Sequence, residues 1–146
     1  MRSLKSLSFN HRTPIQIRFN DIDKLEHVNN SVYQQFYDLG RVAYFDDVLQ
    51  EQMDWNIEGL ILASITIEFL VSIKLHDRIE VRTKVFEIGN KSLKMVQELY
   101  NLTTGAISSS SQSVMVNYSN GQGKTLLIPE KWRGRIMSFE GDLLPR

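Results

Sequence analysis

The stretch Arg18-Phe-Asn-Asp-Ile-Asp-Lys-Leu-Glu-His-Val-Asn-Asn30 joins two segments of different periodicity. Apolar and polar side chains alternate over residues 13–20, which end within this stretch, and the alternation predicts a half-buried strand. After it, apolar residues recur at helical spacing, and either Asn29 or Asn30 is suited to cap the helix. A helix that runs to about Gln50 is on the order of 30 Å long. Its broad apolar face needs a sheet to cover it.

The rest of the chain supplies that sheet. Turn signals such as Gly89-Asn90 divide it into segments rich in β-branched and aromatic residues. The predicted strands span residues 60–71, 78–88, 93–100 and 106–118. In the first of them, Ile61 and Ile67 fall on one face with period two. The run Ser108–Ser113 is compatible with a flexible loop, but its position between apolar strand signals favours a strand.

One strand, one long helix and four further strands without βαβ alternation predict an α+β fold, with an antiparallel sheet curled around the helix. The chain forms one domain over residues 1–146. Residues 1–12 are expected to be a loose leader, and the tail over residues 131–146 adds at most a half-turn of helix. Such a sheet leaves long edge strands, which commonly pair in oligomers, so we expect at least a homodimer.

Composition excludes several classes of protein. With 17 basic and 17 acidic residues the formal net charge is zero, which argues against a non-specific nucleic-acid binder. The absence of cysteine excludes disulfides, a cysteine nucleophile and thiolate metal sites. The three histidines lack the spacing of metal ligands, so neither a metal nor a cofactor is expected. Because no secretory signal or membrane span is evident, we expect a cytoplasmic protein without membrane insertion.

Asp23 is the leading candidate for chemistry, because it lies where the predicted strand meets the helix. A carboxylate there can attack a bound carbonyl or activate a water, while the free N–H groups of the helix N-terminus stabilise an oxyanion. The same acid can also act only as a favourable charge at the helix dipole, worth about 0.3–1 kcal/mol. Asp21 is expected to be an exposed turn acid.

The neighbours of Asp23 allow functional and structural interpretations. Histidine side chains titrate near neutral pH, so His27 can orient a water or a carboxylate, although a lone loop histidine is more often structural. Asn29 and Asn30 serve equally well as caps without catalysis. Lys91 and Lys94 can meet substrate phosphates or remain solvated. No Gly-x-Ser-x-Gly elbow is present, so in a hydrolase a carboxylate must carry the chemistry.

The string Asp21-Ile-Asp-Lys-Leu-Glu-His-Val-Asn-Asn-Ser-Val-Tyr33, with Phe36-Tyr-Asp-Leu-Gly-Arg41 after it, resembles hotdog-fold acyl-CoA thioesterases of the 4-hydroxybenzoyl-CoA thioesterase type. It is similar to the branch with a His-Val-Asn-Asn motif, like that of the plant acyl-carrier-protein thioesterases. Weaker matches at 88–92 and 128–130 extend the resemblance over residues 13–135. The chain departs from the family at Glu26, where glycine or glutamine is usual, and at Leu25, where the plant enzymes have a functional asparagine.

The resemblance implies a five-stranded antiparallel sheet wrapped around one long central helix. It implies homodimers or homotetramers whose active sites form between subunits. The activity it implies is hydrolysis of an acyl-CoA or acyl-carrier-protein thioester to a free acid and a thiol. The family's catalytic acid, a nucleophile or a general base, maps to Asp23, and the helix amide that polarises the carbonyl maps near Asn30.

We therefore assign catalysis to Asp23, His27 and Asn30, and substrate binding to Asn29, Tyr33, Lys91 and Ser92. Two alternatives stay open. One is a non-catalytic hotdog protein that binds acyl-CoA or acyl-carrier-protein. The other is a hotdog dehydratase, although an acid and a histidine in one loop suit proton abstraction beside a carbonyl poorly.

Overall fold

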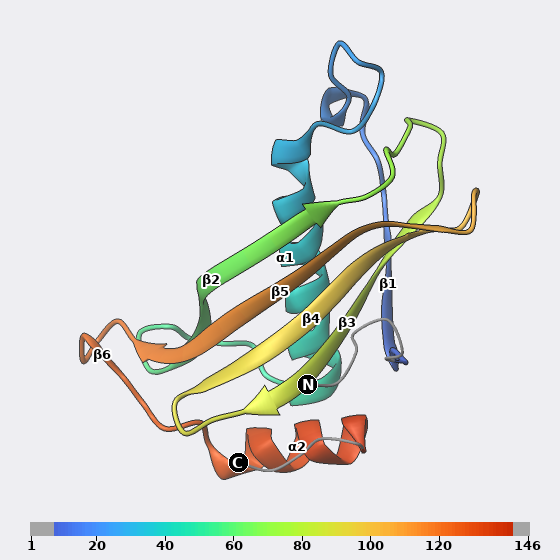
Figure 1. The fold of residues 1–146 in the computed structure, drawn as a ribbon. Helices are drawn as coiled ribbons and strands as arrows, with labels where there is room; N and C mark the ends of the chain where they lie inside the picture. Colours follow the sequence, from blue (N-terminus) through green and yellow to red (C-terminus); the bar gives the residue numbers. More distant parts are fainter. Residues whose placement is uncertain (1–7, 142–146) are drawn as a thin grey trace.

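A computed structural model describes residues 8–141, in which a long helix lies across an antiparallel sheet (Figure 1). The helical segments are a 3-10 turn at Asn30–Val32, α1 at Tyr33–Tyr44, a π-helical turn at Phe45–Leu49, and α2 at Glu130–Glu140. The strands are β1 His11–Ile15, β2 Gly59–Phe69, β3 Ile79–Ile88, β4 Ser92–Asn101, β5 Ala106–Ser119 and β6 Lys124–Thr125. The sheet order is β1-β3-β4-β5-β2, with β6 paired to β5. The predicted hotdog architecture, with five main strands around one long helix, is confirmed.

The long helix begins and ends where the sequence predicts. Three consecutive helical segments cover Asn30–Leu49, and Gln50 ends them in the left-handed conformation with φ of 56°. Gly40 faces β3 so closely that a Cβ atom would lie 2.9 Å from the Val81 side chain. No helix among residues 8–141 is long and apolar enough to cross a membrane.

The first strand differs from the prediction at both ends. β1 begins at His11, inside the predicted leader, and ends at Ile15, where its pairing with β3 ends. The alternation continues past it, but Phe19 is 80% exposed and opens a 3-10 turn at Phe19–Asp21. The rest of the predicted leader, residues 1–7, lies outside the described residues.

The predicted face of β2 is wrong in its first half. The register with β5 slips between Leu62 and Ser64, which leaves Ala63 as a bulge. Before the bulge Leu60 and Leu62 pack into the core, while Ile61 is 37% exposed. After it Ile67 packs against the core around α1.

The serine run of β5 is a strand, as the sequence favours. Ser109, Ser111 and Ser113 are buried, and their small side chains let α1 approach the sheet. The Tyr37 hydroxyl donates to Ser109 Oγ (2.7 Å), and Ser109 Oγ donates to the Glu68 carbonyl (2.8 Å). Burial raises the pKa of the Tyr37 hydroxyl, which therefore stays protonated.

A second buried network fixes the middle of α1. Gln97 Nε2 donates to the Tyr37 carbonyl (3.1 Å) and to Thr83 Oγ1 (3.0 Å). Its oxygen accepts from Arg41 Nη1 (3.0 Å), and Arg41 also pairs with the exposed carboxylate of Asp38. Arg41 therefore has a structural role, because its side chain links the helix to the sheet.

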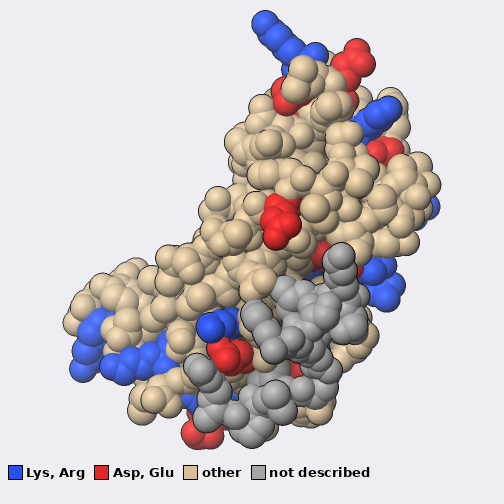
Figure 2. Space-filling model, viewed as in Figure 1, with Lys and Arg blue, Asp and Glu red and all other residues tan. Residues whose placement is uncertain are grey.

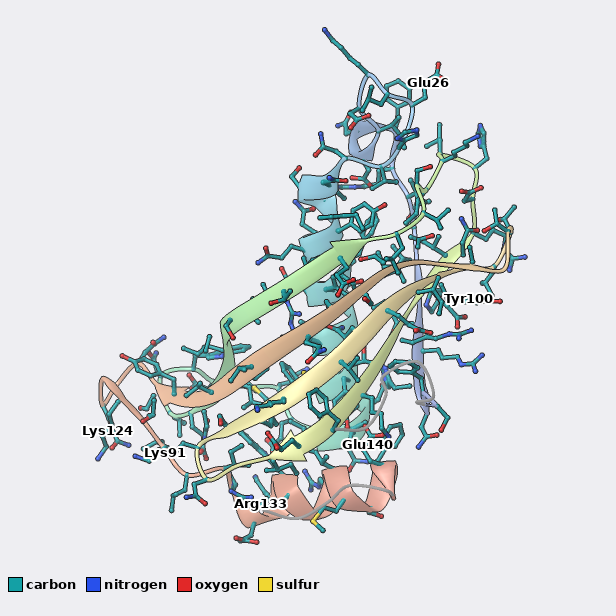
Figure 3. All side chains as sticks on the ribbon, in the orientation of Figure 1. Glu26, Lys91, Tyr100, Lys124, Arg133 and Glu140 are labelled. Carbon is teal, nitrogen blue, oxygen red and sulfur yellow. The ribbon has the colours of Figure 1, made fainter. Side chains whose placement is uncertain are left out.

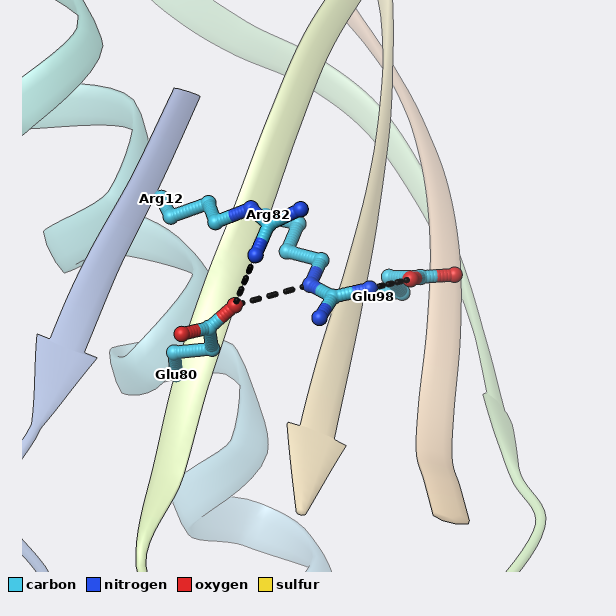
Figure 4. A network of polar contacts seen from close by, with 4 residues as sticks. All are labelled: Arg12, Glu80, Arg82 and Glu98. Carbon is cyan, nitrogen blue, oxygen red and sulfur yellow. Dashed lines mark hydrogen bonds and ion pairs between the residues drawn. The ribbon is translucent and has the colours of Figure 1, made fainter. Parts of the chain in front are cut away.

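The opposite face of the sheet carries a row of charges (Figure 4). Arg82 Nε pairs with Glu80 (2.8 Å), Arg82 Nη1 pairs with Glu98 (3.3 Å), and Arg12 lies 3.8 Å from Glu80. Burial raises the pKa of Glu98, and the Arg82 guanidinium opposes this shift. The face of the sheet away from α1 is therefore polar around Arg82.

The tail is a full helix rather than the predicted half-turn. α2 lies across one end of the sheet (Figure 1), and Trp132 and Ile136 are buried against Leu49 and Leu93. Its last residue, Glu140, reaches inside. Residues 142–146 of the predicted tail lie outside the described part of the chain.

Glu140 is held by three contacts. It accepts hydrogen bonds from the Tyr44 hydroxyl (2.7 Å) and from the Val85 amide (3.1 Å), and it pairs with Lys84 Nζ (3.3 Å). The Lys84 and Glu140 side chains are 2% and 0% exposed. A buried ion pair does not by itself raise stability, but removal of one charge is costly.

We expect Glu140→Gln to lower the free energy of unfolding by about 2 kcal/mol, because the buried Lys84 ammonium loses the charge of Glu140 while an amide oxygen still accepts hydrogen bonds. Urea denaturation followed by circular dichroism measures the change. Glu130→Gln is the matched control, since Glu130 on the same helix is 95% exposed. An unchanged urea midpoint for Glu140→Gln would show that the buried pair does not anchor α2.

Candidate active site

The loop between β1 and α1 closes into a short two-stranded ribbon. The Asn29 amide donates to the Asp21 carbonyl (2.8 Å), and the Asp23 amide donates to the His27 carbonyl (3.0 Å). Between them Ile22 and Val28 form an antiparallel bridge and pack into the core. The Val28 amide donates to the Ile73 carbonyl (2.8 Å), so the ribbon is tied to the chain that follows β2.

Asp23 keeps part of its carboxylate unused. The side chain is half-buried, and Oδ1 accepts from the Leu25 amide (2.9 Å), which fixes the side chain over the turn. No donor among residues 8–141 contacts the other oxygen. One carboxylate oxygen of Asp23 therefore fixes the turn, and the other is available to a substrate or a water.

His27 lies opposite Asp23 in the ribbon. Residues opposite one another on paired strands share a face, so both side chains leave the ribbon away from Ile22 and Val28. The two are not hydrogen-bonded to each other, and no described residue holds the His27 ring. The acid and the histidine thus share a face of the loop without forming a pair.

Asp21 is not the exposed acid that the sequence predicts. Its carboxylate is 1% exposed, accepts from the Arg18 amide (2.8 Å) and pairs with Arg18 Nη2 (2.9 Å). These contacts close the turn that ends the extended segment. Asp21 therefore holds the loop in shape, and Asp23 is the acid available for chemistry.

The start of the long helix presents an unused amide. Asn29 is the cap: its side chain accepts from the Ser31 amide (2.9 Å), and its carbonyl accepts from the Val32 amide (2.9 Å). The Asn30 N–H has no acceptor among the described residues, and the Asn30 side chain is exposed. A free N–H at a helix N-terminus suits a developing oxyanion.

Tyr33 lies one turn into the helix and is 2% exposed. Its ring packs edge-on against Phe69 at the end of β2, with the centroids 4.9 Å apart. Burial raises the pKa of the Tyr33 hydroxyl. Tyr33 thus forms an apolar floor beside the helix start.

The tip of the loop explains one departure from the family pattern. Glu26 has φ of 66°, in the left-handed region where glycine is strain-free, and it lies at the end of the molecule (Figure 3). The glycine that is usual in the family therefore adopts this left-handed conformation without strain, whereas Glu26 adopts it with strain.

We expect Glu26→Gly to raise the free energy of unfolding by about 0.5–1 kcal/mol, because the strain of a left-handed side chain disappears. Lys24→Gly is the matched control, because Lys24 is exposed in the same loop without a positive φ, and there glycine should lower stability. Thermal denaturation measures both. Equal effects of the two substitutions would contradict the strain at Glu26.

Lys91 and Ser92 are not brought to this loop within one subunit. Lys91 lies in the turn from β3 to β4 and Ser92 is the first residue of β4, at the other end of the sheet and close to α2 (Figures 1 and 3). Lys91 is exposed, whereas Lys94 pairs with Glu87 (3.0 Å). The remaining predicted residues lie in the ribbon and in the first turns of the long helix: Asp23, His27, Asn29, Asn30 and Tyr33.

A cavity of about 680 Å³ lies elsewhere, over β2, β4 and β5. Glu68, Glu98 and Ser110 are neighbours across these strands and line it, and Glu98 belongs to the charged row on the face away from α1. None of the predicted site residues lines this cavity. No group of three potential metal ligands is present in residues 8–141.

Comparison with known proteins places this geometry in a family. Residues 17–136 match the thioesterase-like superfamily. The chain belongs to that superfamily. The match includes the Asp23 loop, the whole long helix and most of α2. No curated protein sequence matches the chain.

Solved structures, thioesterases among them, share its fold. A Thermus thermophilus thioesterase in complex with coenzyme A and zinc is 29% identical, with a TM-score of 0.80 over 93% of this chain and 98% of that one. A 1,4-dihydroxy-2-naphthoyl-CoA thioesterase from Synechocystis is 14% identical, with a TM-score of 0.75 over 86% and 94%. A hypothetical Staphylococcus aureus protein in complex with CoA is 15% identical, with a TM-score of 0.80 over 91% and 85%.

Proposed function

We propose that this thioesterase-like protein hydrolyses acyl-CoA thioesters, with Asp23 as the reacting carboxylate. One observation carries the proposal: Asp23 offers a free oxygen in a loop that ends at a helix whose first amide, on Asn30, is also free. Water adds to the thioester carbonyl, the carbon–sulfur bond breaks, and a free acid and a thiol leave.

One carboxylate and one backbone N–H donor suffice for this reaction. A thiol leaving group has a pKa of about 8.5, so it departs with little help from a general acid. The main barrier is the negative charge on the carbonyl oxygen, and one well-placed N–H donor is worth about 3 kcal/mol. Asp23 then acts as nucleophile or removes a proton from water, and His27 on the same face orients that water.

The remaining predicted residues take supporting roles. Asn29 caps the helix and so aims the Asn30 amide. Tyr33 and Phe69 supply an apolar wall for the acyl group beside the carbonyl. The Asp-x-Asp and His-Val-Asn-Asn pattern favours the branch that acts on acyl-CoA or acyl-carrier-protein, and the CoA complexes of similar structures favour CoA.

The site is completed in a homodimer formed through β2. This strand is 11 residues long, ends the sheet order, and presents Ile61 and Phe69 with 37% and 46% exposure. Its free edge carries no proline, a combination that favours pairing with a second copy. A twofold axis beside β2 makes the two copies of the strand antiparallel.

We expect Ile61→Lys with Ser64→Lys to convert the dimer into a monomer, because the four added cations on the two paired edges would repel one another. Sedimentation velocity measures the mass. Leu127→Lys is the control, since Leu127 is 66% exposed and is not part of β2. Dimers that survive the double substitution would place the interface elsewhere.

A thiol-release assay over acyl-CoA substrates of increasing chain length, with detection of the free acid, tests the proposed activity. Release of both products by the wild-type protein is expected. Binding of acyl-CoA without thiol release would instead support a non-catalytic acyl-binding protein, and water elimination from a hydroxyacyl-CoA would support a dehydratase.

A further inference from the structure

The cavity on the face of the sheet away from α1 takes no part in the proposed hydrolysis. Its volume is about 680 Å³, and sites for small molecules commonly measure about 300–1,000 Å³. The described residues that line it come from β2, β4 and β5 and from the segments next to β1 and β2. Neither Asp23 nor Asn30 is among them. A second ligand can therefore bind here without entering the candidate active site.

A row of polar side chains crosses this cavity from strand to strand. Glu68 on β2 lies opposite Ser110 on β5, and Ser110 lies opposite Glu98 on β4. Residues opposite one another on paired strands share a face, and all three line the cavity. Neighbouring strands are about 4.8 Å apart, so the two glutamate Cα atoms are about 10 Å apart. Both carboxylates can therefore reach one small group placed above Ser110.

The charges of this row are not balanced. Arg82 is shared between Glu80 (2.8 Å) and Glu98 (3.3 Å), and Arg12 lies 3.8 Å from Glu80 (Figure 4). Glu68 is exposed and forms no ion pair with residues 8–141. Figure 2 shows an acidic side chain among uncharged residues over the end of β2. The excess negative charge is therefore on the β2 side of the cavity.

Glu98 is held partly out of water. Its side chain is 14% exposed, and burial raises its pKa although the Arg82 guanidinium opposes the shift. Arg82 thus compensates only part of the cost of burying this carboxylate. A second cation beside Glu98 would stabilise its ionised form further. Acids with such a shift in a cavity are often part of a binding site.

Apolar side chains flank the polar row. Val96 precedes Glu98 by two residues on β4 and lines the cavity, but it is already buried. Leu70 and Ile107 line the cavity as well and are 53% and 42% exposed. They are close to each other, because the Leu70 amide donates to the carbonyl of Ser108 (2.9 Å), the residue after Ile107. A ligand with an apolar chain would remove both side chains from water.

We infer that this cavity binds a primary alkylammonium ion, with its charged end above Ser110 between Glu68 and Glu98 and its chain on Leu70 and Ile107. A primary ammonium has three N–H donors, and two carboxylates and one hydroxyl supply three acceptors. Pairing of β2 with a second copy uses main-chain groups in the plane of the sheet, so it leaves the face that carries Glu68 free. The inference adds an amine ligand and does not rest on the proposed hydrolysis.

Calorimetric titration of the wild-type protein with hexylammonium chloride tests the site. Hexylammonium should bind at least about tenfold more tightly than hexanol, which lacks the charge, and than hexyltrimethylammonium, which lacks N–H donors. Equal binding of hexanol would overturn the charge recognition, and equal binding of the quaternary ion would overturn the hydrogen-bonded ammonium. Nα-acetyl-lysine methylamide should also bind at least about tenfold more weakly. Equal affinity for it would assign the cavity to a lysine of another protein and overturn the inference.

Two substitutions separate the charged end from the chain. Glu68→Gln should weaken hexylammonium binding about tenfold, because it removes the carboxylate that has no other cation. Glu130→Gln, at an exposed acid of α2 outside the cavity, should not change it. Ile107→Ser should weaken hexylammonium about threefold, whereas Leu127→Ser, at an exposed apolar residue outside the cavity, should have no effect. Glu68→Gln protein that is folded by circular dichroism and binds like the wild type would overturn the site.

Nuclear magnetic resonance locates the amine. Amide resonances of residues 66–68, 96–98 and 110–112 should shift with hexylammonium, and those of residues 23–30 should not. Shifts confined to residues 23–30, or displacement of the amine by coenzyme A, would place it in the candidate active site and overturn the inference. The proposed hydrolysis fails separately: wild-type protein that releases no thiol contradicts the enzyme but leaves amine binding intact. An active enzyme that binds no hexylammonium overturns only the amine site.

Discussion

Asp23→Asn is expected to lower kcat for acyl-CoA hydrolysis by about three orders of magnitude and to leave KM nearly unchanged. A positioned base contributes a factor of about 10² to 10⁴, and loss of a nucleophile costs at least as much. The amide keeps an oxygen that accepts from the Leu25 N–H, so the loop keeps its shape. Stopped-flow or continuous thiol detection at saturating substrate measures the change.

Glu26→Gln is the matched control for this prediction. Glu26 is an acid three residues further along the same loop, but it is exposed at the tip. Its neutralisation should leave kcat within about twofold of the wild type, as expected for an exposed charge screened by solvent. Equal kcat values for wild type and Asp23→Asn would remove Asp23 from the mechanism.

Asn30→Pro is expected to lower kcat by a factor of about 10² to 10³, because proline deletes the one backbone donor proposed for the oxyanion. The fold should tolerate it. Proline is favoured at the first position of a helix, and Asn29 already has the extended backbone that precedes proline, with φ of −62° and ψ of 137°.

Asn30→Ala separates the amide from the side chain. It keeps the N–H and removes only an exposed carboxamide, so kcat should stay close to that of the wild type. Circular dichroism checks that both variants are folded. A proline variant that is folded and fully active would show that the carbonyl is polarised by another donor.

Helical periodicity predicted the long helix well because its apolar stripe extends over five turns. Strand alternation was less reliable. Beyond Ile15 the pattern continues in the sequence, but β3 offers no further partner, and Asp21 folds back onto Arg18. Pairing with a neighbour, rather than alternation, decides where β1 ends.

The missed α2 has a weaker signal. After Pro129 the apolar residues Trp132, Ile136 and Phe139 have helical spacing, but most other positions are polar. From the sequence alone, the buried Glu140 would be taken for an acid on the surface. Only the contact with Lys84 and Tyr44 reveals its place. A polar residue buried by tertiary contacts cannot be recognised from local sequence.

The candidate site was proposed from sequence, but the sequence did not predict its geometry. The pattern around His27 identified the loop, whereas the two acids were distinguished only by the burial of Asp21. The contacts of Asp21 with Arg18, which the local pattern does not reveal, determine that result.

The structure of Asp23→Asn bound to a ketone analogue of acyl-CoA, with a methylene in place of the sulfur, shows which donor polarises the carbonyl. We expect the carbonyl oxygen at about 2.9 Å from the Asn30 nitrogen, the usual length of such a hydrogen bond. We also expect the residue 23 side chain beside the carbonyl carbon. A carbonyl bound away from the first turn of the long helix, for instance in the cavity over β2, β4 and β5, would contradict the proposed mechanism.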